Sequence, residues 1–162
     1  MFNKDRYSKG SHTVLDIKYH FVWKTKYSYK ILKGDLALRI RNLLKIIAAE
    51  KGISIIKGNI RPDHIHVLVG APAYFSPSKV AQLLKGKSSY RLQKEFPNLK
   101  KRYWGQHIWS RGYFCATVGA VTEELVKKYI EHQGEEDKDF KVWDENTDEA
   151  KKKANEILNS LY

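Results

Sequence analysis

The stretch ISIIKGNIRPDHIHVLVG, residues 53–70, sets the fold class of this chain. Residues 53–60 and residues 64–70 are two short runs rich in β-branched residues, a composition typical of strands. Arg61-Pro62-Asp63 separates them. Proline cannot donate to a strand ladder and aspartate favours turns, so these three residues predict a turn. The whole stretch is therefore predicted to form a β-hairpin.

Two histidines open the second strand of this hairpin. His64 and His66 are two residues apart, so on a strand they project from the same face, while Ile65 points to the other. Two imidazoles this close can chelate one divalent metal ion, or they can be two unrelated polar residues on a solvated face. The apolar residues after the pair indicate a central strand, where an unused polar pair would be costly.

The segments around the hairpin complete an α+β pattern. Residues 14–23 alternate, with Tyr19, Phe21 and Trp23 on one face and Asp16, Lys18 and His20 on the other, which predicts a half-buried strand. Helical spacing of apolar residues predicts helices over 35–51, with Gly52 as a C-cap, and over 78–95. Trp23, Trp104 and Trp109 are expected in the core.

The last part of the domain adds a strand over 113–119 and a helix from Thr122 to about Gln133. The order β-α-β-β-α-β-α has, in its first six elements, the split βαβ pattern. This predicts a ferredoxin-like antiparallel sheet with helices on one face, followed by a C-terminal helix. Residues 1–134 are expected to form a single domain and residues 135–162 a charged tail.

The predicted last helix carries a second polar pair. Tyr129 and Gln133 are four residues apart and share one helix face. Such a pair can simply pack against a sheet. It can also place a phenol nucleophile beside an amide oxygen that serves as a metal ligand.

The chain is strongly basic. Its formal net charge is +12, and residues 135–162 hold five lysines against nine acidic residues, a balance of −4 that leaves +16 on residues 1–134. A domain of this charge suggests a polyanionic partner, most simply nucleic acid. Basic and aromatic side chains suited to phosphate contact and base stacking are Lys79, Lys85, Lys87, Arg91, Arg102, Arg111 and Tyr113.

Four segments, taken in order, resemble the single-tyrosine HUH transposases of the smallest insertion sequences, the IS200-like transposases. YHFVWKTKY (19–27) resembles the first-strand signature of that family and RPDHIHVLV (61–69) its metal strand. HIWSRGYFCATVG (107–119) resembles its Trp-Ser-x-Gly-Tyr-Phe segment, and YIEHQ (129–133) its catalytic helix. The resemblance extends from about residue 10 to residue 134.

The resemblance implies a specific chemistry. His64, His66 and Gln133 would bind a divalent metal, Mg²⁺ or Mn²⁺, and Tyr129 would be the nucleophile. Members of the family cut and rejoin single-stranded DNA at the hairpin-flanked ends of an insertion sequence, through a 5′-phosphotyrosine link that leaves a free 3′-OH. They are homodimers in which the tyrosine helix of one chain completes the site of the other.

Two other functions compete with this one. A non-catalytic single-stranded nucleic-acid-binding domain could use a similar basic sheet, but it would leave the histidine pair and YIEHQ without a use. A domesticated relative that cuts repeated hairpins in its host genome would keep the same chemistry. The single cysteine, Cys115, allows no disulfide within the chain, and no segment resembles a signal peptide or a membrane span, so a cytoplasmic protein is expected.

Overall fold

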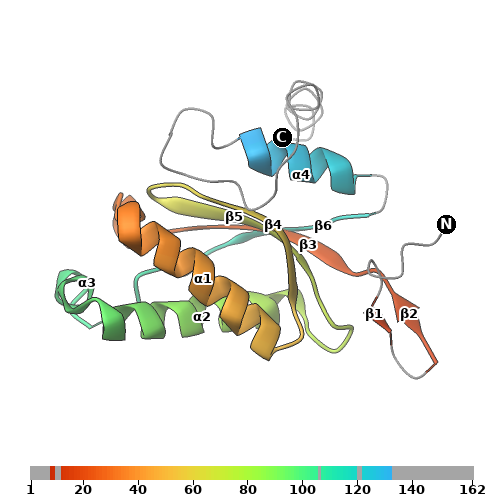
Figure 1. Ribbon diagram of the computed structural model, residues 1–162, viewed down its shortest axis with the longest axis horizontal. Helices are drawn as coiled ribbons and strands as arrows, with labels where there is room; N and C mark the ends of the chain where they lie inside the picture. Colours follow the sequence, from red (N-terminus) through yellow and green to blue (C-terminus); the bar gives the residue numbers. More distant parts are fainter. Residues whose placement is uncertain (1–7, 10–11, 106, 120–121, 133–162) are drawn as a thin grey trace.

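In the computed structural model, residues 8–9, 12–105, 107–119 and 122–132 are described. A four-stranded antiparallel sheet lies at the centre, with strand order β4-β5-β3-β6 (Figure 1). Its strands are β3 (Lys18–Lys24), β4 (Ser54–Ile60), β5 (His64–Gly70) and β6 (Phe114–Thr117). The first and third strands along the chain are central and the second and fourth are at the edges, which is the ferredoxin-like arrangement.

Helices cover both faces of the sheet. Helices α1 (Gly34–Glu50) and α2 (Pro77–Glu95) lie on one face, and α4 (Glu123–His132) lies on the other (Figure 1). A short helix, α3 (Pro97–Arg102), follows α2, and a 3-10 turn (Lys26–Ser28) follows β3. The ferredoxin-like fold with an added C-terminal helix, predicted from the sequence, is confirmed.

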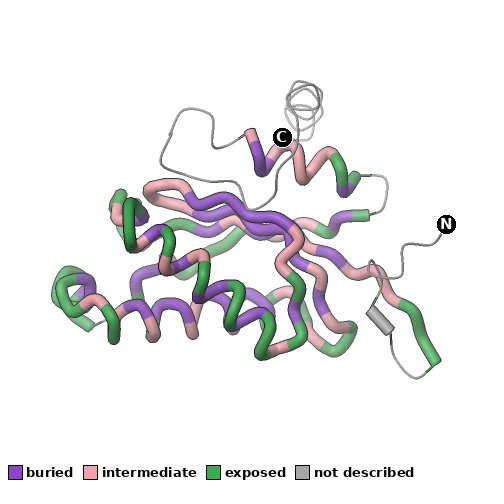
Figure 2. Tube along the Cα trace, in the orientation of Figure 1, coloured by how far each residue is buried: buried purple, intermediate pink, exposed green. Residues whose placement is uncertain are grey.

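The predicted hairpin is present in full. Strands β4 and β5 pair antiparallel from Ser54↔Gly70 to Ile60↔Ile65, with an irregularity between Ile55 and Lys57. Strand β5 is central, as the apolar run indicated, because its other edge pairs with β3. The main core lies between the sheet and the helices α1 and α2, where Ile65, Val67 and Val69 are fully buried (Figure 2).

Helix boundaries follow local signals. Helix α1 is followed by Gly52, whose φ of +68° is the left-handed conformation that glycine adopts most easily. Helix α2 begins one residue before the predicted range, at Pro77, and the Ser76 side chain accepts a hydrogen bond from the Lys79 amide. Gly86 does not interrupt α2.

Several sequence predictions are wrong in detail. The strand predicted over 14–23 is divided, since Val14–Leu15 (β2) pairs with Ser8–Lys9 (β1) in a separate two-stranded sheet. Trp104 is 81% exposed at the end of α3, whereas Trp23 and Trp109 are buried as expected. The sheet face predicted to be solvated carries buried Lys18 and His20, because α4 covers it.

Candidate active site

The candidate site lies on the sheet face that α4 covers. On β5, His64 and His66 share this face, and their ring centroids are 5.1 Å apart. His66 is 4% exposed, whereas His64 is half-buried at the start of the strand. The structure therefore places the two imidazoles side by side, as the i, i+2 spacing on a strand predicts.

Helix α4 brings Tyr129 to the same place. The Tyr129 ring lies edge-on to that of His66, with centroids 5.6 Å apart. The side chain is half-buried and packs on an apolar cluster formed by Leu68, Val118 and Ile130. The predicted nucleophile and the predicted metal strand thus meet within one chain. Gln133, the expected third ligand, lies outside the described residues.

A third histidine belongs to the site, and sequence reasoning assigned it no role. His20, on β3, is buried, and its Nε2 lies 3.3 Å from Nδ1 of His66. Its ring stacks on that of His66 and lies edge-on to Tyr129, with centroids 5.5 Å and 5.9 Å apart. The alternation of residues 14–23 placed His20 on the face away from the core. The register that brings β3 beside β5 was not readable from the sequence.

The two histidines of β5 each have a partner at Nδ1. His64 Nδ1 donates a hydrogen bond to the carboxylate of Asp63 over 2.7 Å, and His66 Nδ1 faces His20. The Asp63 carboxylate fixes the proton of His64 on Nδ1, and in the His20–His66 pair His66 has to donate from Nδ1 for its Nε2 to act as a ligand. In both residues the nitrogen left for a ligand is Nε2.

Burial keeps the central imidazoles neutral. Burial lowers the pKa of His20 to about 4. Burial also lowers the pKa of His66 well below its ordinary value, and the nearby charges of His20, His64 and Arg61 add to the effect. For Asp63, burial is the largest single influence and acts to raise the pKa, but the hydrogen bond from His64, a backbone hydrogen bond and the charges of His64 and Lys24 together outweigh it, so the pKa is below its usual value. A neutral imidazole is the form that binds a metal.

The donor set suits a divalent metal with positions left for substrate. Two imidazoles stand side by side, and the side-chain oxygen of Asn59, which is opposite His66 in the strand register, is buried with no hydrogen-bond partner. Within the described ranges, no three His, Cys, Asp or Glu side chains converge as a metal site. A complete site therefore needs further oxygen ligands, such as an amide, water or phosphate.

The predicted DNA-binding residues fall into separate places. Lys87 and Arg91 on α2 face Glu50 of α1, and Arg91 forms an ion pair with it at 2.8 Å. Lys79 is exposed on the first turn of α2. The Arg102 guanidinium lies over the ring of Tyr29, 4.4 Å from its centroid.

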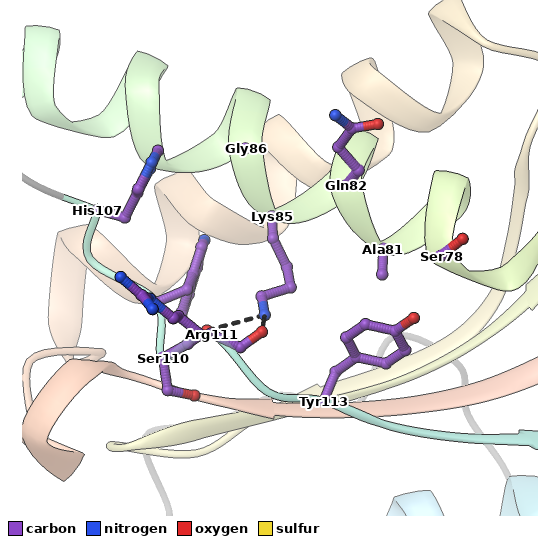
Figure 3. Close-up of a pocket in the computed structure, with 10 residues that line it drawn as sticks. Ser78, Ala81, Gln82, Lys85, Gly86, His107, Ser110, Arg111 and Tyr113 are labelled. Atoms are coloured by element: carbon purple, nitrogen blue, oxygen red, sulfur yellow. Dashed lines mark hydrogen bonds between the residues drawn. The ribbon is translucent and has the colours of Figure 1, made fainter.

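Lys85, Arg111 and Tyr113 come together in one pocket of about 460 Å³ between α2 and the loop that leads into β6 (Figure 3). The Lys85 ammonium donates hydrogen bonds to three backbone carbonyls of that loop, those of Ser110, Arg111 and Gly112, over 2.8 to 3.1 Å. Burial lowers the pKa of Lys85. Arg111 and Tyr113 are exposed, so a ligand can contact the side chains of these two residues.

Comparison with known proteins shows the family of the chain. The family described as "Transposase IS200 like" matches residues 13–133. The chain belongs to the IS200-like transposase family. It is 34% identical over 125 residues to the ISDra2 transposase TnpA of Deinococcus radiodurans, covering 77% of this chain and 89% of that protein. It is 37% identical over 128 residues to the transposase for insertion sequence element IS200 of Salmonella typhimurium, covering 79% and 84%.

Solved structures of two transposases share the fold of this IS200-like transposase. A candidate transposase from Deinococcus radiodurans, crystallised at 1.90 Å resolution, superposes with a TM-score of 0.64 at 32% identity, covering 78% of this chain and 97% of the other. A REP-associated tyrosine transposase bound to a REP hairpin superposes with a TM-score of 0.55, covering 78% and 72%. At 11% identity, the second match shows a common fold. Among the described residues, no helix has the length and apolar character needed to cross a membrane.

Proposed function

We propose that this transposase cuts and rejoins single-stranded DNA at hairpin-flanked ends of an insertion sequence, with Tyr129 as the nucleophile. The observation that carries the proposal is the contact between the Tyr129 ring and His66, at 5.6 Å between centroids, on a strand that presents two imidazoles. The named relatives are transposases of insertion sequences. A tyrosine transposase of the same fold is bound to a REP hairpin, which supports a hairpin as the substrate.

In the proposed reaction the Tyr129 phenol oxygen attacks the scissile phosphorus. A 5′-phosphotyrosine bond forms, the phenol gives up its proton, and the departing 3′ oxygen takes one and becomes a free 3′-OH. Attack by a 3′-OH on the phosphotyrosine reverses these steps and restores the phenol. Because the covalent link keeps the energy of the broken phosphodiester, joining needs no nucleotide cofactor.

His64, His66 and Gln133 would hold the divalent metal, Mg²⁺ or Mn²⁺. When bound, it would supply charge neutralisation and orientation of the scissile phosphate. The contacts of Asp63 and His20 with Nδ1 of His64 and His66 would leave Nε2 of each ring as the metal ligand. Two neutral imidazoles and an amide add no negative charge, so the full charge of the metal would act on the DNA.

A homodimer with shared active sites is part of the proposal. In the family, the tyrosine helix of one chain completes the site of its partner, and the shortness of the segment between β6 and α4 limits where that helix can go. In the single chain, α4 packs on its own sheet. Formation of the dimer would require the same contacts to be made between chains.

The decisive experiment is a search for the covalent intermediate. The protein is incubated with a labelled single-stranded hairpin and Mg²⁺ or Mn²⁺, and the products are separated on a denaturing gel. We expect a protein–DNA adduct that Tyr129→Phe abolishes while hairpin binding stays intact, because the ring packs and only the hydroxyl reacts. Normal cleavage by Tyr129→Phe would show that another group is the nucleophile.

A further inference from the structure

We infer that two buried ion pairs, Lys57–Glu131 and Lys18–Glu123, set the position of helix α4 on the sheet and thereby the position of Tyr129. The inference rests on the proposed role of Tyr129 as nucleophile, and it makes these four residues positioning residues. They do not touch the reacting atoms. Each pair joins α4 to a different strand, and the two strands lie on opposite sides of β5.

The first pair ties the C-terminal half of α4 to β4. The Lys57 ammonium contacts the Glu131 carboxylate, and the two side chains are 1% and 5% exposed. Beside this pair, the Asn59 amide donates a hydrogen bond to the backbone carbonyl of Ile130 over 2.9 Å. Lys57 and Asn59 of the edge strand β4 thus bind Glu131 and Ile130, the two helix residues that directly follow Tyr129.

The second pair ties the first turn of α4 to β3. The Lys18 ammonium lies 3.0 Å from the Glu123 carboxylate, and the two side chains are 5% and 8% exposed. Asp16 contacts the same ammonium, and Lys127, one turn along α4, lies 3.2 Å from Glu123. The acidic start of the helix is therefore held against a lysine of the sheet.

The spacing of the pairs explains how they fix Tyr129. Glu123 and Glu131 are eight residues apart, so they lie about 12 Å apart along the helix axis. Lys18 and Lys57 belong to the strands on either side of β5, so α4 crosses the strand of His64 and His66 and is tied on both sides of it. Tyr129 lies between the two ties.

The apolar contact beneath α4 is too small to define a register alone. It has three buried members, Leu68, Val118 and Ile130, whereas the core on the opposite face of the sheet is far larger. Apolar burial has no directionality, so a helix could slide on such a surface at little cost. A one-turn shift would separate both ion pairs and move the two carboxylates of α4 away from the buried ammonium groups of Lys18 and Lys57, which is strongly unfavourable. The pairs therefore select one position.

Glu131→Gln tests this inference with little change of shape. It keeps the size of the side chain but leaves the Lys57 ammonium buried beside a neutral amide. We expect adduct formation to slow by about 100-fold, the loss typical of a misplaced reacting group, with hairpin affinity unchanged. Hydrogen exchange of the α4 amides should become faster in the same variant. Wild-type exchange in α4 together with a wild-type rate would overturn the inference.

A matched control and a rescue separate positioning from general stability. Glu95→Gln breaks the ion pair between Arg39 and Glu95 at 2.6 Å, which joins α1 and α2 on the other face of the sheet, and it should leave both the rate and α4 exchange unchanged.

Lys57→Glu places two carboxylates together and should be the most damaging variant. Adding Glu131→Lys to it should recover part of the rate and of the α4 protection. A double variant no better than Lys57→Glu would show that the pairing has no role.

The two readouts distinguish failure of this inference from failure of the proposed function. Hydrogen exchange of α4 reports docking without DNA or metal. If the wild-type protein forms no adduct but Glu131→Gln still speeds exchange in α4, the catalytic proposal fails and the docking role stands. If adduct forms and exchange in α4 is the same in both proteins, the positioning inference fails and the catalytic proposal stands.

Discussion

His66 is the residue on which the candidate site converges. It touches the rings of His20, His64 and Tyr129, each from a different position on the sheet or on α4. With Nδ1 facing His20, its Nε2 is the nitrogen that remains for a metal. Its burial has a chemical consequence, because a low pKa keeps the ring neutral at physiological pH.

At the residue scale, the proposed ligands should differ in importance. His64→Ala and His66→Ala are expected to weaken Mn²⁺ binding by more than about 100-fold, and Gln133→Ala by less, because imidazole is the better ligand for this ion. Asp63→Asn, which only weakens the hold on His64, should cost about 10- to 100-fold. Isothermal titration calorimetry of the metal-free variants measures this order. Cleavage that continues undiminished in excess EDTA would refute the metal site.

At the scale of elements, the loop before β6 depends on α2. Lys85 links the two by donating to three loop carbonyls, so its role is structural as well as electrostatic. Lys85→Met should lower the free energy of unfolding by about 2 kcal/mol, because three carbonyls lose a charged donor. Chemical denaturation measures this loss.

Arg111→Ala, in the same pocket, should leave stability unchanged and weaken hairpin binding. Lower stability in Arg111→Ala, together with unchanged stability and weaker hairpin binding in Lys85→Met, would contradict the roles assigned to the two residues.

The docking of α4 should also respond to acid through Glu123. Burial is the largest single influence and acts to raise the pKa of this carboxyl, but the hydrogen bonds and the positive charges of Lys18 and Lys127 together outweigh it, and the net pKa is below its ordinary value of 4.5. The folded state therefore binds fewer protons than the unfolded state, so this stabilisation is complete above pH 4.5 and is lost as pH falls through the lowered pKa. The carboxylates of Asp16 and Glu124 lie nearby, beside Lys18 and Lys127, so the comparison must be with Glu123→Gln.

We expect the protection factors of the α4 amides, which are corrected for the intrinsic exchange rate at each pH, to fall below pH 4.5 more steeply in the unmodified protein than in Glu123→Gln. The variant should start from weaker protection at neutral pH, since it has already lost the charge pair. Equal slopes in the two proteins would show that Glu123 does not contribute to the acid response.

At the scale of the whole molecule, the question is which sheet receives α4 in the active assembly. Tyr129→Phe and His64→Ala proteins should each be inactive alone. In a co-purified heterodimer with shared sites, one site combines intact histidines with an intact tyrosine, and the adduct should form on the His64→Ala chain. If each site were formed within one chain, every site in the heterodimer would lack either the Tyr129 hydroxyl or the His64 imidazole. An inactive heterodimer would therefore exclude sharing.

The sequence by itself determined the ferredoxin-like order of elements, the hairpin and the pairing of His64 with His66. These follow from short-range rules, because alternation on a strand and turn residues act within a few positions. The helical spacing that placed Tyr129 on one face of α4 is equally local.

Only the tertiary structure decided what faces these residues. His20 joins the site because β3 pairs with β5, and Lys18 and Lys57 are buried because α4 covers their face of the sheet. In the sequence, Lys18 and His20 fall on the side of the strand that was predicted to be solvated. The burial of all three residues depends on contacts between residues as far apart as 74 positions, such as Lys57 and Glu131, and such contacts leave no local pattern.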